Sequence, residues 1–247
     1  MNKWGVLALA SSVALTGCGG DDDDTAKLFR ERTGIYFHNQ LTDYSGSGTE
    51  EADTTVDLVI RNDLSDPLIE NQAYSTNEQG GVAFKLDEDT ETVRFDVNND
   101  STTLVDDAGI NLAAGRNYTL ILIGQLAGSG DQVPRLKRFV QSAQAIASNQ
   151  VRVRLIHALS DASGETVSVD VEGDNVVSSL GYGMATGYVT GVPAVAGQLE
   201  MEITLSAGGS STKTCTVEGG KSYDAIITHP SYDSAAVAVF CQQVARS

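Results

Sequence analysis

An internal repeat is the feature of this sequence that most constrains its fold. The segment VRLIHALSD ends at Asp161 and is followed by TVSVDVEGD, and IYFHNQLTD ends at Asp43 and is followed by TVDLVIRND. Further along, VEGGKSYDAIITH with Tyr223 matches LAAGRNYTLILIG with Tyr118. Because the matches occur in the same order in both halves, the sequence predicts two copies of one folded unit.

Each copy has the pattern of short strands. In VSVDVE, Val167, Val169 and Val171 alternate with polar residues, which is the two-residue period of a half-buried strand. LEMEITL alternates in the same way, and Gly173-Asp174 favours a turn. Many short strands in roughly 100 residues indicate a two-sheet sandwich. We therefore expect an all-β protein of two tandem antiparallel β-sandwich (immunoglobulin-like) domains.

The boundary between the copies is expected in SAQAIASNQ, so that the first module covers residues 34–145 and the second residues 150–247. The preceding RLKRFVQSAQAIA is the best helical candidate, but its first half aligns with AAVAVFCQ of the second copy, with Phe139 against Phe240. We therefore expect a final strand that runs into a linker. Each copy is long enough to bury its own core.

The first residues have the form of an export signal. A positive start at Lys3 is followed by an apolar core from Trp4 to Leu15, which is shorter than the roughly 20 residues that a membrane-spanning helix needs. We expect residues 1–17 to be a cleaved signal peptide. Residues 18–33 would then be a flexible acidic tether, because glycines make a linker flexible and like charges extend it.

The segment Leu15-Thr16-Gly17-Cys18 resembles the lipobox of bacterial lipoproteins. The resemblance implies that Cys18 becomes the lipidated N-terminus, with a diacylglycerol thioether and an amide-linked acyl chain such as palmitate. Two or more acyl chains anchor a protein stably. Gly19 differs from the Asp that resembles an inner-membrane retention signal, which favours a cell-envelope location at the outer membrane, periplasmic or surface-exposed. The alternative is an ordinary secreted protein with a chance cysteine near its cleavage site.

Charge excludes some partners. The formal net charge is -17, whereas phosphate binding needs clustered Lys and Arg, so we expect no nucleic-acid partner. The same balance disfavours lying flat on an anionic membrane. The lipid anchor is therefore the membrane contact that we expect.

Three longer stretches carry a second resemblance. VRVRLIHALSDASGETVSVDV, GYGMATGYVTGVPA and TVEGGKSYDAIITH resemble the bacterial domain-of-unknown-function family 4397, whose members often form tandem modules in exported proteins. The resemblance is strongest over residues 150–230 and weaker over 34–125. It implies a β-sandwich outside the cytoplasm and supplies no catalytic residues.

The cysteines indicate a disulfide. With Cys18 committed to lipid, Cys215 and Cys241 form an even pair in an oxidising location. The repeat alignment sets Cys215 opposite Ile110 and Cys241 opposite Val140, as expected for two facing core positions. We predict a Cys215–Cys241 disulfide. A two-cysteine metal site without a nearby histidine is a poorer alternative.

The histidines indicate structural roles. His157 is in phase with the buried face of its strand, and its counterpart is Asn39, so we expect a polar group that satisfies a loop backbone. His38 is expected to point towards solvent, and His229 lies in a loop before Pro230. The spacing His-x-x-x-His is absent from the sequence, so we predict no metal site.

The segment HALSD brings His157, Ser160 and Asp161 close together in sequence, but a catalytic triad needs the three groups within hydrogen-bond reach in space. An Asp that ends a strand is usually a turn-former. The sequence has no Gly-x-Ser-x-Gly elbow and no phosphate-binding glycine loop. We therefore expect no catalytic residues, no cofactor and no enzyme, with a hydrolase as a distant alternative.

An acidic segment has part of a calcium-binding pattern. Asp96, Asn98 and Asp100 have the D-x-N-x-D spacing and Asp107 falls at the twelfth place, but Ser101 stands where an EF-hand loop needs glycine. A hairpin turn with solvated acids is the better interpretation.

These observations leave a binding or adhesion module with an unknown envelope glycan or protein ligand as the expected function. A structural spacer or assembly partner in an envelope complex is the alternative. Tyr182 and Tyr188 in GYGMATGYVTG could form a sugar-stacking platform, although tyrosines in a sandwich are more often core or corner residues.

Overall fold

The computed structural model describes residues 31–43, 54–61, 66–99, 102–194 and 197–245. Nearly all regular structure in these residues is β, arranged as four four-stranded sheets in two sandwiches. The prediction of two tandem β-sandwich domains is confirmed. No helix within this described part of the chain has the length and apolarity to cross a bilayer.

The first module contains two sheets, with strand orders β4-β1-β7-β8 and β3-β2-β5-β6. Its strands are β1 (Thr33–Thr42), β2 (Val56–Ile60), β3 (Ile69–Gln72), β4 (Val82–Phe84), β5 (Thr90–Asn99), β6 (Thr102–Ala113), β7 (Asn117–Gln125) and β8 (Arg135–Val140), with the short 3-10 helix η2 (Gly130–Gln132) before β8.

The second module repeats this plan, with orders β12-β9-β15-β16 and β11-β10-β13-β14. Its strands are β9 (Gln150–His157), β10 (Thr166–Val171), β11 (Asp174–Gly181), β12 (Val189–Pro193), β13 (Gln198–Leu205), β14 (Ser210–Thr216), β15 (Ser222–Thr228) and β16 (Ala238–Gln243). Each order is that of the first module shifted by eight strands, so every position in one module has an equivalent in the other.

The central strand pairs are parallel, so the two sheets that contain them are mixed, whereas the other two sheets are antiparallel. Ile35 of β1 lies beside Tyr118 of β7, and Val153 of β9 lies beside Tyr223 of β15, in both cases in parallel register. The two strands of each pair are neighbours in the sheet, but along the sequence all four strands of the module's other sheet lie between them. Almost every residue of these strands is buried, as is typical of parallel strands covered on both faces.

Each sandwich has its own apolar core. Leu58, Phe95 and Leu120 are fully buried between the sheets of the first module, and Val169 and Met201 are equally buried in the second. The alternation in VSVDV matches this arrangement, because the valines of β10 face the core while the residues between them are half-buried. Burial of these side chains is the main stabilising term in each module.

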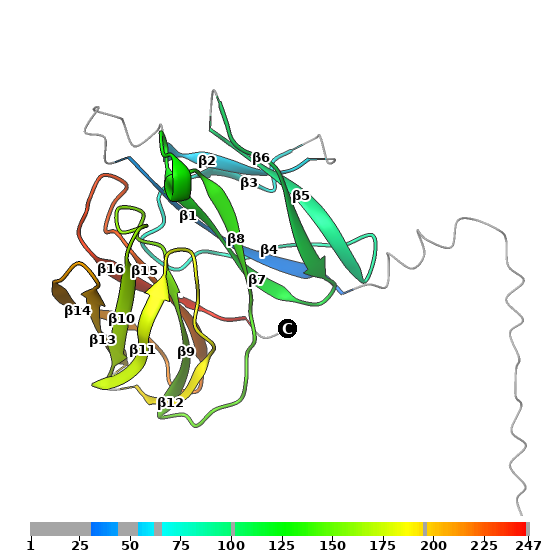
Figure 1. The fold of residues 1–247 in the computed structure, drawn as a ribbon. Helices are drawn as coiled ribbons and strands as arrows, with labels where there is room; N and C mark the ends of the chain where they lie inside the picture. Colours follow the sequence, from blue (N-terminus) through cyan, green and yellow to red (C-terminus); the bar gives the residue numbers. More distant parts are fainter. Residues whose placement is uncertain (1–30, 44–53, 62–65, 100–101, 195–196, 246–247) are drawn as a thin grey trace, which may run out of the picture.

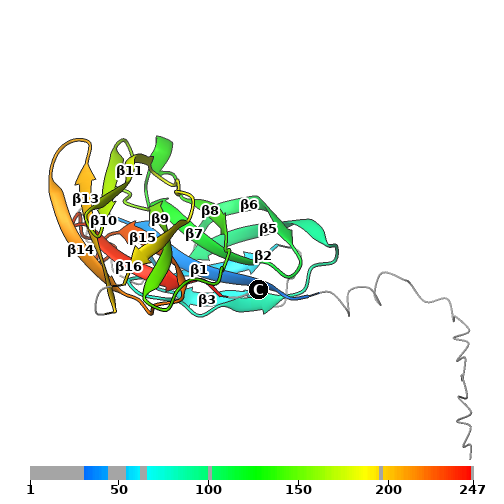
Figure 2. The same ribbon diagram turned by 90° about the horizontal axis from the view of Figure 1, so that it is seen from below.

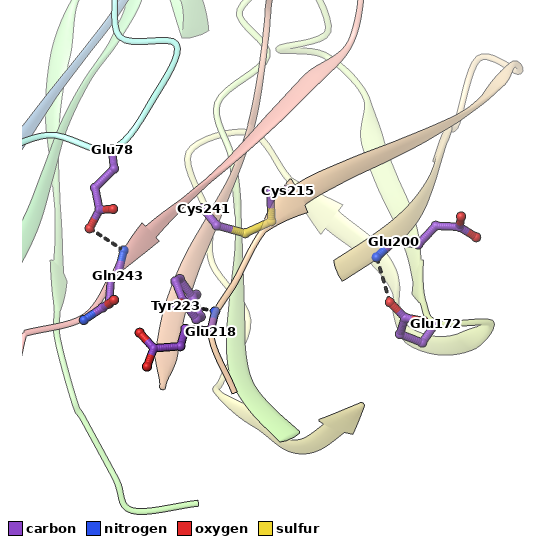
Figure 3. Close-up of a disulfide and its surroundings, with 8 residues drawn as sticks. All are labelled: Glu78, Glu172, Glu200, Cys215, Glu218, Tyr223, Cys241 and Gln243. Atoms are coloured by element: carbon purple, nitrogen blue, oxygen red, sulfur yellow. Dashed lines mark hydrogen bonds between the residues drawn. A yellow bond between two sulfur atoms is a disulfide. The ribbon is translucent and has the colours of Figure 1, made fainter. Parts of the chain in front are cut away.

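A disulfide joins the two sheets of the second module at their edges. Cys215 on β14 and Cys241 on β16 form the predicted bond, with their Cα atoms 5.8 Å apart (Figure 3). It closes a loop with a sequence separation of 26, for which chain entropy suggests about 3.5 kcal/mol of stabilisation, depending on the model of the unfolded state.

The first module closes the same edge with an arginine. Strand register places Arg138 opposite Cys241, because Arg138 pairs with Leu120 as Cys241 pairs with Ala225. The expectation that Val140 is the counterpart of Cys241 is therefore wrong by two residues. Arg138 Nη1 donates to the Asn111 carbonyl at 2.6 Å, so a hydrogen bond from β8 to β6 stands where the second module has its disulfide.

The modules pack against each other through the outer faces of the two sheets that contain the parallel pairs. In Figures 1 and 2 the sheet with β1, β7 and β8 and the sheet with β9, β15 and β16 form the middle of the molecule, and the remaining sheets lie outside them. A third apolar cluster fills this junction, with Ile121 and Ile123 from the first module and Ile156, Ile226 and Phe240 from the second. The protein is therefore a stack of four sheets.

A buried ion pair lies beside this apolar cluster. Arg154 donates to both carboxylate oxygens of Asp224, from Nε at 2.9 Å and from Nη2 at 2.6 Å. The hydroxyl of Tyr188 donates to Asp224 Oδ1 at 2.8 Å, and that of Thr119 donates to Oδ2 at 2.5 Å across the junction. Arg154 Nη1 also donates to the Val140 carbonyl of the first module. Asp224 thus has four donors, two of them from a guanidinium with which it forms bidentate hydrogen bonds.

Replacing one member of this pair tests its role. Asp224→Asn removes the anion and leaves the Arg154 guanidinium buried without a counter-charge, which costs about 3–5 kcal/mol in comparable pairs. We expect the free energy of unfolding, measured with urea, to fall by this amount. The double variant Arg154→Met with Asp224→Asn should regain much of the lost free energy of unfolding, because no uncompensated charge remains buried.

The matched control is Asp107→Asn, which breaks the exposed Arg94–Asp107 pair on the first module. Exposed pairs contribute only about 0–1 kcal/mol, so this variant should remain close to wild type. Equal effects of Asp224→Asn and Asp107→Asn would contradict the importance of the buried pair.

Candidate functional site: a groove in the flank of the first module

The first module has a groove where its two sheets meet at the β3 and β4 edges. Its cavity is about 590 Å³. We call it the flank groove, and it is lined by Ile60, Leu68, Phe84, Lys85, Leu86, Asp87, Glu91, Thr92, Val93 and Arg94. Cavities of roughly 300–1,000 Å³ are the size that commonly binds small molecules or single side chains of a partner.

The floor of the flank groove is apolar and comes from three elements. Ile60 ends β2, Phe84 ends β4, and Val93 belongs to the core-facing side of β5. Leu86 and Val93 are buried, whereas Ile60 and Phe84 are only partly buried. The strand ends therefore leave apolar side chains of the core accessible between the sheets.

The rim of the groove carries both positively and negatively charged side chains. Glu91 Oε2 accepts the backbone N–H of Asp87 at 2.8 Å, which fixes the β4–β5 turn. Arg94 on the other side pairs with Asp107 at 2.7 Å, and Asp107 also contacts Arg61 at 3.0 Å. Hydrogen bonds from Arg94 and Arg61 lower the pKa of Asp107, so this carboxylate stays charged. The groove therefore combines an apolar floor with charged residues at its rim.

The second module differs at the equivalent positions. Phe84 pairs with Thr33 as Val192 pairs with Val151, so Val192 occupies the place of Phe84. Val192 is 7% exposed and belongs to the core. By the same register Lys85 is replaced by Pro193, and Arg94 by Glu200. The large ring and the two cations of the groove are thus particular to the first module.

Sequence reasoning did not identify this groove. Its lining residues come from strands that are distant in sequence. A usable signal was the pair of cations, Lys85 and Arg94, within an otherwise acidic and apolar stretch.

The structure overturns one prediction about the histidines. His38 was expected to face solvent, but it is fully buried, with its ring 5.3 Å from that of Phe240 across the module junction. The reason is that the second module covers the outer face of β1. Burial lowers the pKa of His38 to about 3, and neither ring nitrogen has a hydrogen-bond partner within the described residues.

The other two histidines are also buried. His157 Nδ1 accepts the N–H of Leu159, as expected for a group that satisfies a loop backbone, and burial lowers its pKa to about 4. His229 lies 3.1 Å from Asp161 through Nε2 and contacts the Ala236 carbonyl through Nδ1. In the part of the chain that the structure describes, no cluster of three or more metal-ligating side chains is found.

The residues of HALSD are engaged separately. Ser160 Oγ accepts a hydrogen bond from the Tyr182 hydroxyl at 3.2 Å, while His157 binds its own loop and Asp161 contacts His229. In the described structure, the partners of these three side chains are thus Leu159, Tyr182 and His229, and the three are not hydrogen-bonded to one another.

The acidic segment considered for calcium forms a hairpin between β5 and β6. Asp96 accepts the backbone N–H of Asp107, and the Asp107 carboxylate forms ion pairs with Arg61 and Arg94. Asp100 and Ser101 lie outside the described residues.

The tyrosines have structural roles. Tyr182 is 9% exposed and packs edge-on against His157. The ring centroid of Tyr188 lies 4.1 Å from the Arg152 guanidinium and 4.6 Å from that of Arg154. Both rings are therefore occupied by protein groups, and the sugar-stacking interpretation loses its platform.

A comparison with protein families gives one match. Residues 53–165 match a family described as a domain of unknown function, DUF4397. The match supports one module of this family, and it runs from just before β2 into the loop after β9. Its position differs from the expected one, because the resemblance had been placed mainly on residues 150–230. No match was found among curated proteins.

The flank groove lies entirely within the matched residues, so the groove belongs to the part of the chain that this family describes. Assignment of the second sandwich to the same family stays a prediction. The expected signal peptide, residues 1–17, and the predicted lipidation site Cys18 lie outside the described residues.

The buried histidines predict a pH dependence of stability. In the unfolded chain each binds a proton below pH about 6.5, whereas the folded protein keeps His38 neutral down to about 3 and His157 down to about 4. The stabilisation that these neutral histidines provide is thus fully present above pH about 6.5, and it is lost as the pH falls below that value. Each should lower the free energy of unfolding by roughly 1.4 kcal/mol per pH unit between 6.5 and the folded value.

Urea unfolding at pH 7.0 and 5.0 measures this slope. His38→Leu removes one titrating group, and His157→Asn, which introduces the residue at the equivalent position of the first module, removes the other. Each variant should show a shallower slope than wild type. Identical slopes for the three proteins would contradict the assignment.

Proposed function

We propose that this chain is a lipid-anchored protein of the cell envelope that binds an envelope glycan or protein through the flank groove and performs no catalysis. The observation that supports binding is the groove itself, with an apolar floor, a charged rim and a volume of about 590 Å³. The location rests on the export signal and the lipobox-like segment that ends at Cys18.

The non-catalytic interpretation is supported by the polar groups. The titratable residues that line the groove are Lys85, Asp87, Glu91 and Arg94, and its lining includes no histidine or cysteine. All three histidines are buried, and burial lowers the pKa of His38 to about 3 and that of His157 to about 4. A general acid or base works best with a pKa near the operating pH and within reach of a substrate.

A second candidate function is a spacer or assembly partner in an envelope complex. It is favoured by the buried junction, where an apolar cluster and hydrogen bonds from the ion pair to Thr119 and Val140 join the two modules. Two modules fixed to each other would hold partners at a fixed separation, and the flexible tether would limit how far they can lie from the membrane.

The anchor is tested by Cys18→Ala. We expect the wild-type protein to fractionate with membranes and to incorporate labelled palmitate, and the variant to do neither, because it lacks the thiol that is acylated. A variant that stays in the membrane fraction would refute the anchor. The soluble domain of the wild type, cut in the tether, should be released and serves as a control for folding.

The groove is tested by filling it. Thr92 is an exposed residue of its lining, and Thr92→Trp should block the groove with little effect on the core. The matched control is Gln198→Trp at the equivalent exposed position of the second module. We expect retention on isolated peptidoglycan or on a glycan array to fall at least about tenfold for Thr92→Trp alone, which corresponds to about 1.4 kcal/mol.

The spacer function would be supported instead by two results together. The wild-type protein would be retained by no envelope polymer, and crosslinking in cells would capture it in a stable complex. Retention that is unchanged in Thr92→Trp would show that binding uses another surface.

A further inference from the structure

We propose that the flank groove binds an extended polypeptide strand, which pairs with an open edge of β5 and places one apolar side chain on the groove floor. The bound strand carries a basic residue two positions after the apolar one. This inference rests on the proposed function, because it uses the same groove, and it adds the class of ligand.

The groove runs along the backbone of β5. Residues 91–94, which are consecutive in this strand, all line the groove. Consecutive side chains of a strand point to opposite faces of a sheet, and Val93 is buried on the core side whereas Thr92 and Arg94 are exposed. The surface that all four residues share is therefore the edge of the strand, where the backbone groups lie.

This edge is open because β2 ends before the start of β5 is covered. Pairing of the two strands stops where Ile60 lies opposite Phe95, and the N–H of Arg61 then donates to the Arg94 carbonyl at 2.9 Å. Among the described residues, β6 is the strand that pairs with residues 90–93. The first four residues of β5 thus have a neighbouring strand on one side and the groove on the other.

Thr92 presents its backbone groups to the open side. The groups of successive residues alternate between the two sides of a strand, and the Arg94 carbonyl faces β2 while the Asp89 carbonyl accepts the Ala114 N–H on the β6 side. Thr92 has the same parity as Arg94, so its N–H and its carbonyl point into the lane that β2 has left. An added strand can use both groups, as in other complexes formed by strand addition.

The second module protects the equivalent edge. Glu172 Oε1 accepts the N–H of Glu200 at 2.8 Å, so a side chain caps the strand edge there (Figure 3). Arg61 stands at the place of Glu172 in the first module, and an arginine side chain has no acceptor. Pro193, which replaces Lys85, has no N–H to offer an approaching strand. The first module lacks both the carboxylate cap and the proline.

The pleat of the added strand fixes which of its side chains enter the groove. The pairs of this sheet are antiparallel, so we expect the added strand to run antiparallel to β5. Its residue opposite Val93 faces the core side, where Ile60 and Phe84 form the apolar floor. The next residue lies opposite Thr92, faces solvent and makes the backbone hydrogen bonds. The one after it lies opposite Glu91.

Charge selects the residue opposite Glu91. Residues 85–91 carry four carboxylates and one lysine, and the carboxylates of Asp87 and Glu91 line this end of the groove. Opposite charges on directly facing residues of two strands are stabilising, whereas like charges are destabilising. The ligand pattern is therefore an apolar residue, any residue and then Lys or Arg, in that order along the chain.

The test uses residues 19–247, which contain every described strand, and a fluorescent peptide with the sequence Ser-Thr-Phe-Thr-Lys-Thr-Ser. We expect saturable binding to the wild-type protein in fluorescence anisotropy. Thr92→Trp should abolish it, whereas Gln198→Trp should not. A peptide with the order Lys-Thr-Phe, and one with Glu in place of Lys, should each bind at least about tenfold more weakly.

N-methylated peptides separate strand addition from simple filling of the groove. A methyl group on the amide of the threonine between Phe and Lys removes the N–H that donates to the Thr92 carbonyl, so the peptide should bind at least about tenfold more weakly. The matched control carries the methyl group on the Lys amide, which points away from β5. Its affinity should stay within about threefold of the unmodified peptide.

The inference is overturned if the unmodified peptide does not bind, or if the two N-methylated peptides bind equally well. That failure is distinguishable from failure of the proposed function. Retention on envelope polymers that is lost in Thr92→Trp, without binding of the peptide, would leave the proposed function standing and exclude strand addition. Absence of both retention and peptide binding would overturn both.

Discussion

The hydrogen-bonded ion pair between Arg154 and Asp224 is the constraint on which the arrangement of the modules depends. A charge inside a protein is costly unless it is matched, and here the carboxylate receives two hydrogen bonds from the guanidinium and two from hydroxyls. One of these hydroxyls belongs to the other module. The satisfied pair therefore specifies one position of the two sandwiches, while the apolar cluster around Ile121 and Ile226 supplies most of the driving force.

Local patterns were enough to predict the fold class. The alternation in VSVDV follows from a strand with one face on the core, and the pairing of Cys215 with Cys241 followed from their parity and compartment. The central strands were harder, because burial on both faces removes the alternation that identifies which side faces solvent. His38 was assigned to solvent for this reason, and only the presence of the second module buries it.

The candidate site could not be predicted in the same way. Ile60, Phe84 and Val93 belong to three strands, and they become neighbours only through long-range pairing. Their residue types are ordinary for a sandwich core. What distinguishes Ile60 and Phe84 is incomplete burial, a property of the assembled sheets, whereas Val192, the equivalent of Phe84, is buried in the second module. Comparing structurally equivalent positions of the two modules therefore identifies the residues particular to the groove, which the sequence pattern did not.

The junction has one more property. Thr119 and Asp224 occupy equivalent positions in the two modules, and so do Ile121 and Ile226, and both pairs meet at the junction. The modules thus associate through the same surface about an approximate two-fold axis, as the subunits of a symmetric dimer do. Joining the halves in one chain makes their association independent of protein concentration. The unequal partners at each symmetric site, such as threonine facing aspartate, then allow one half to specialise while the other preserves the contact.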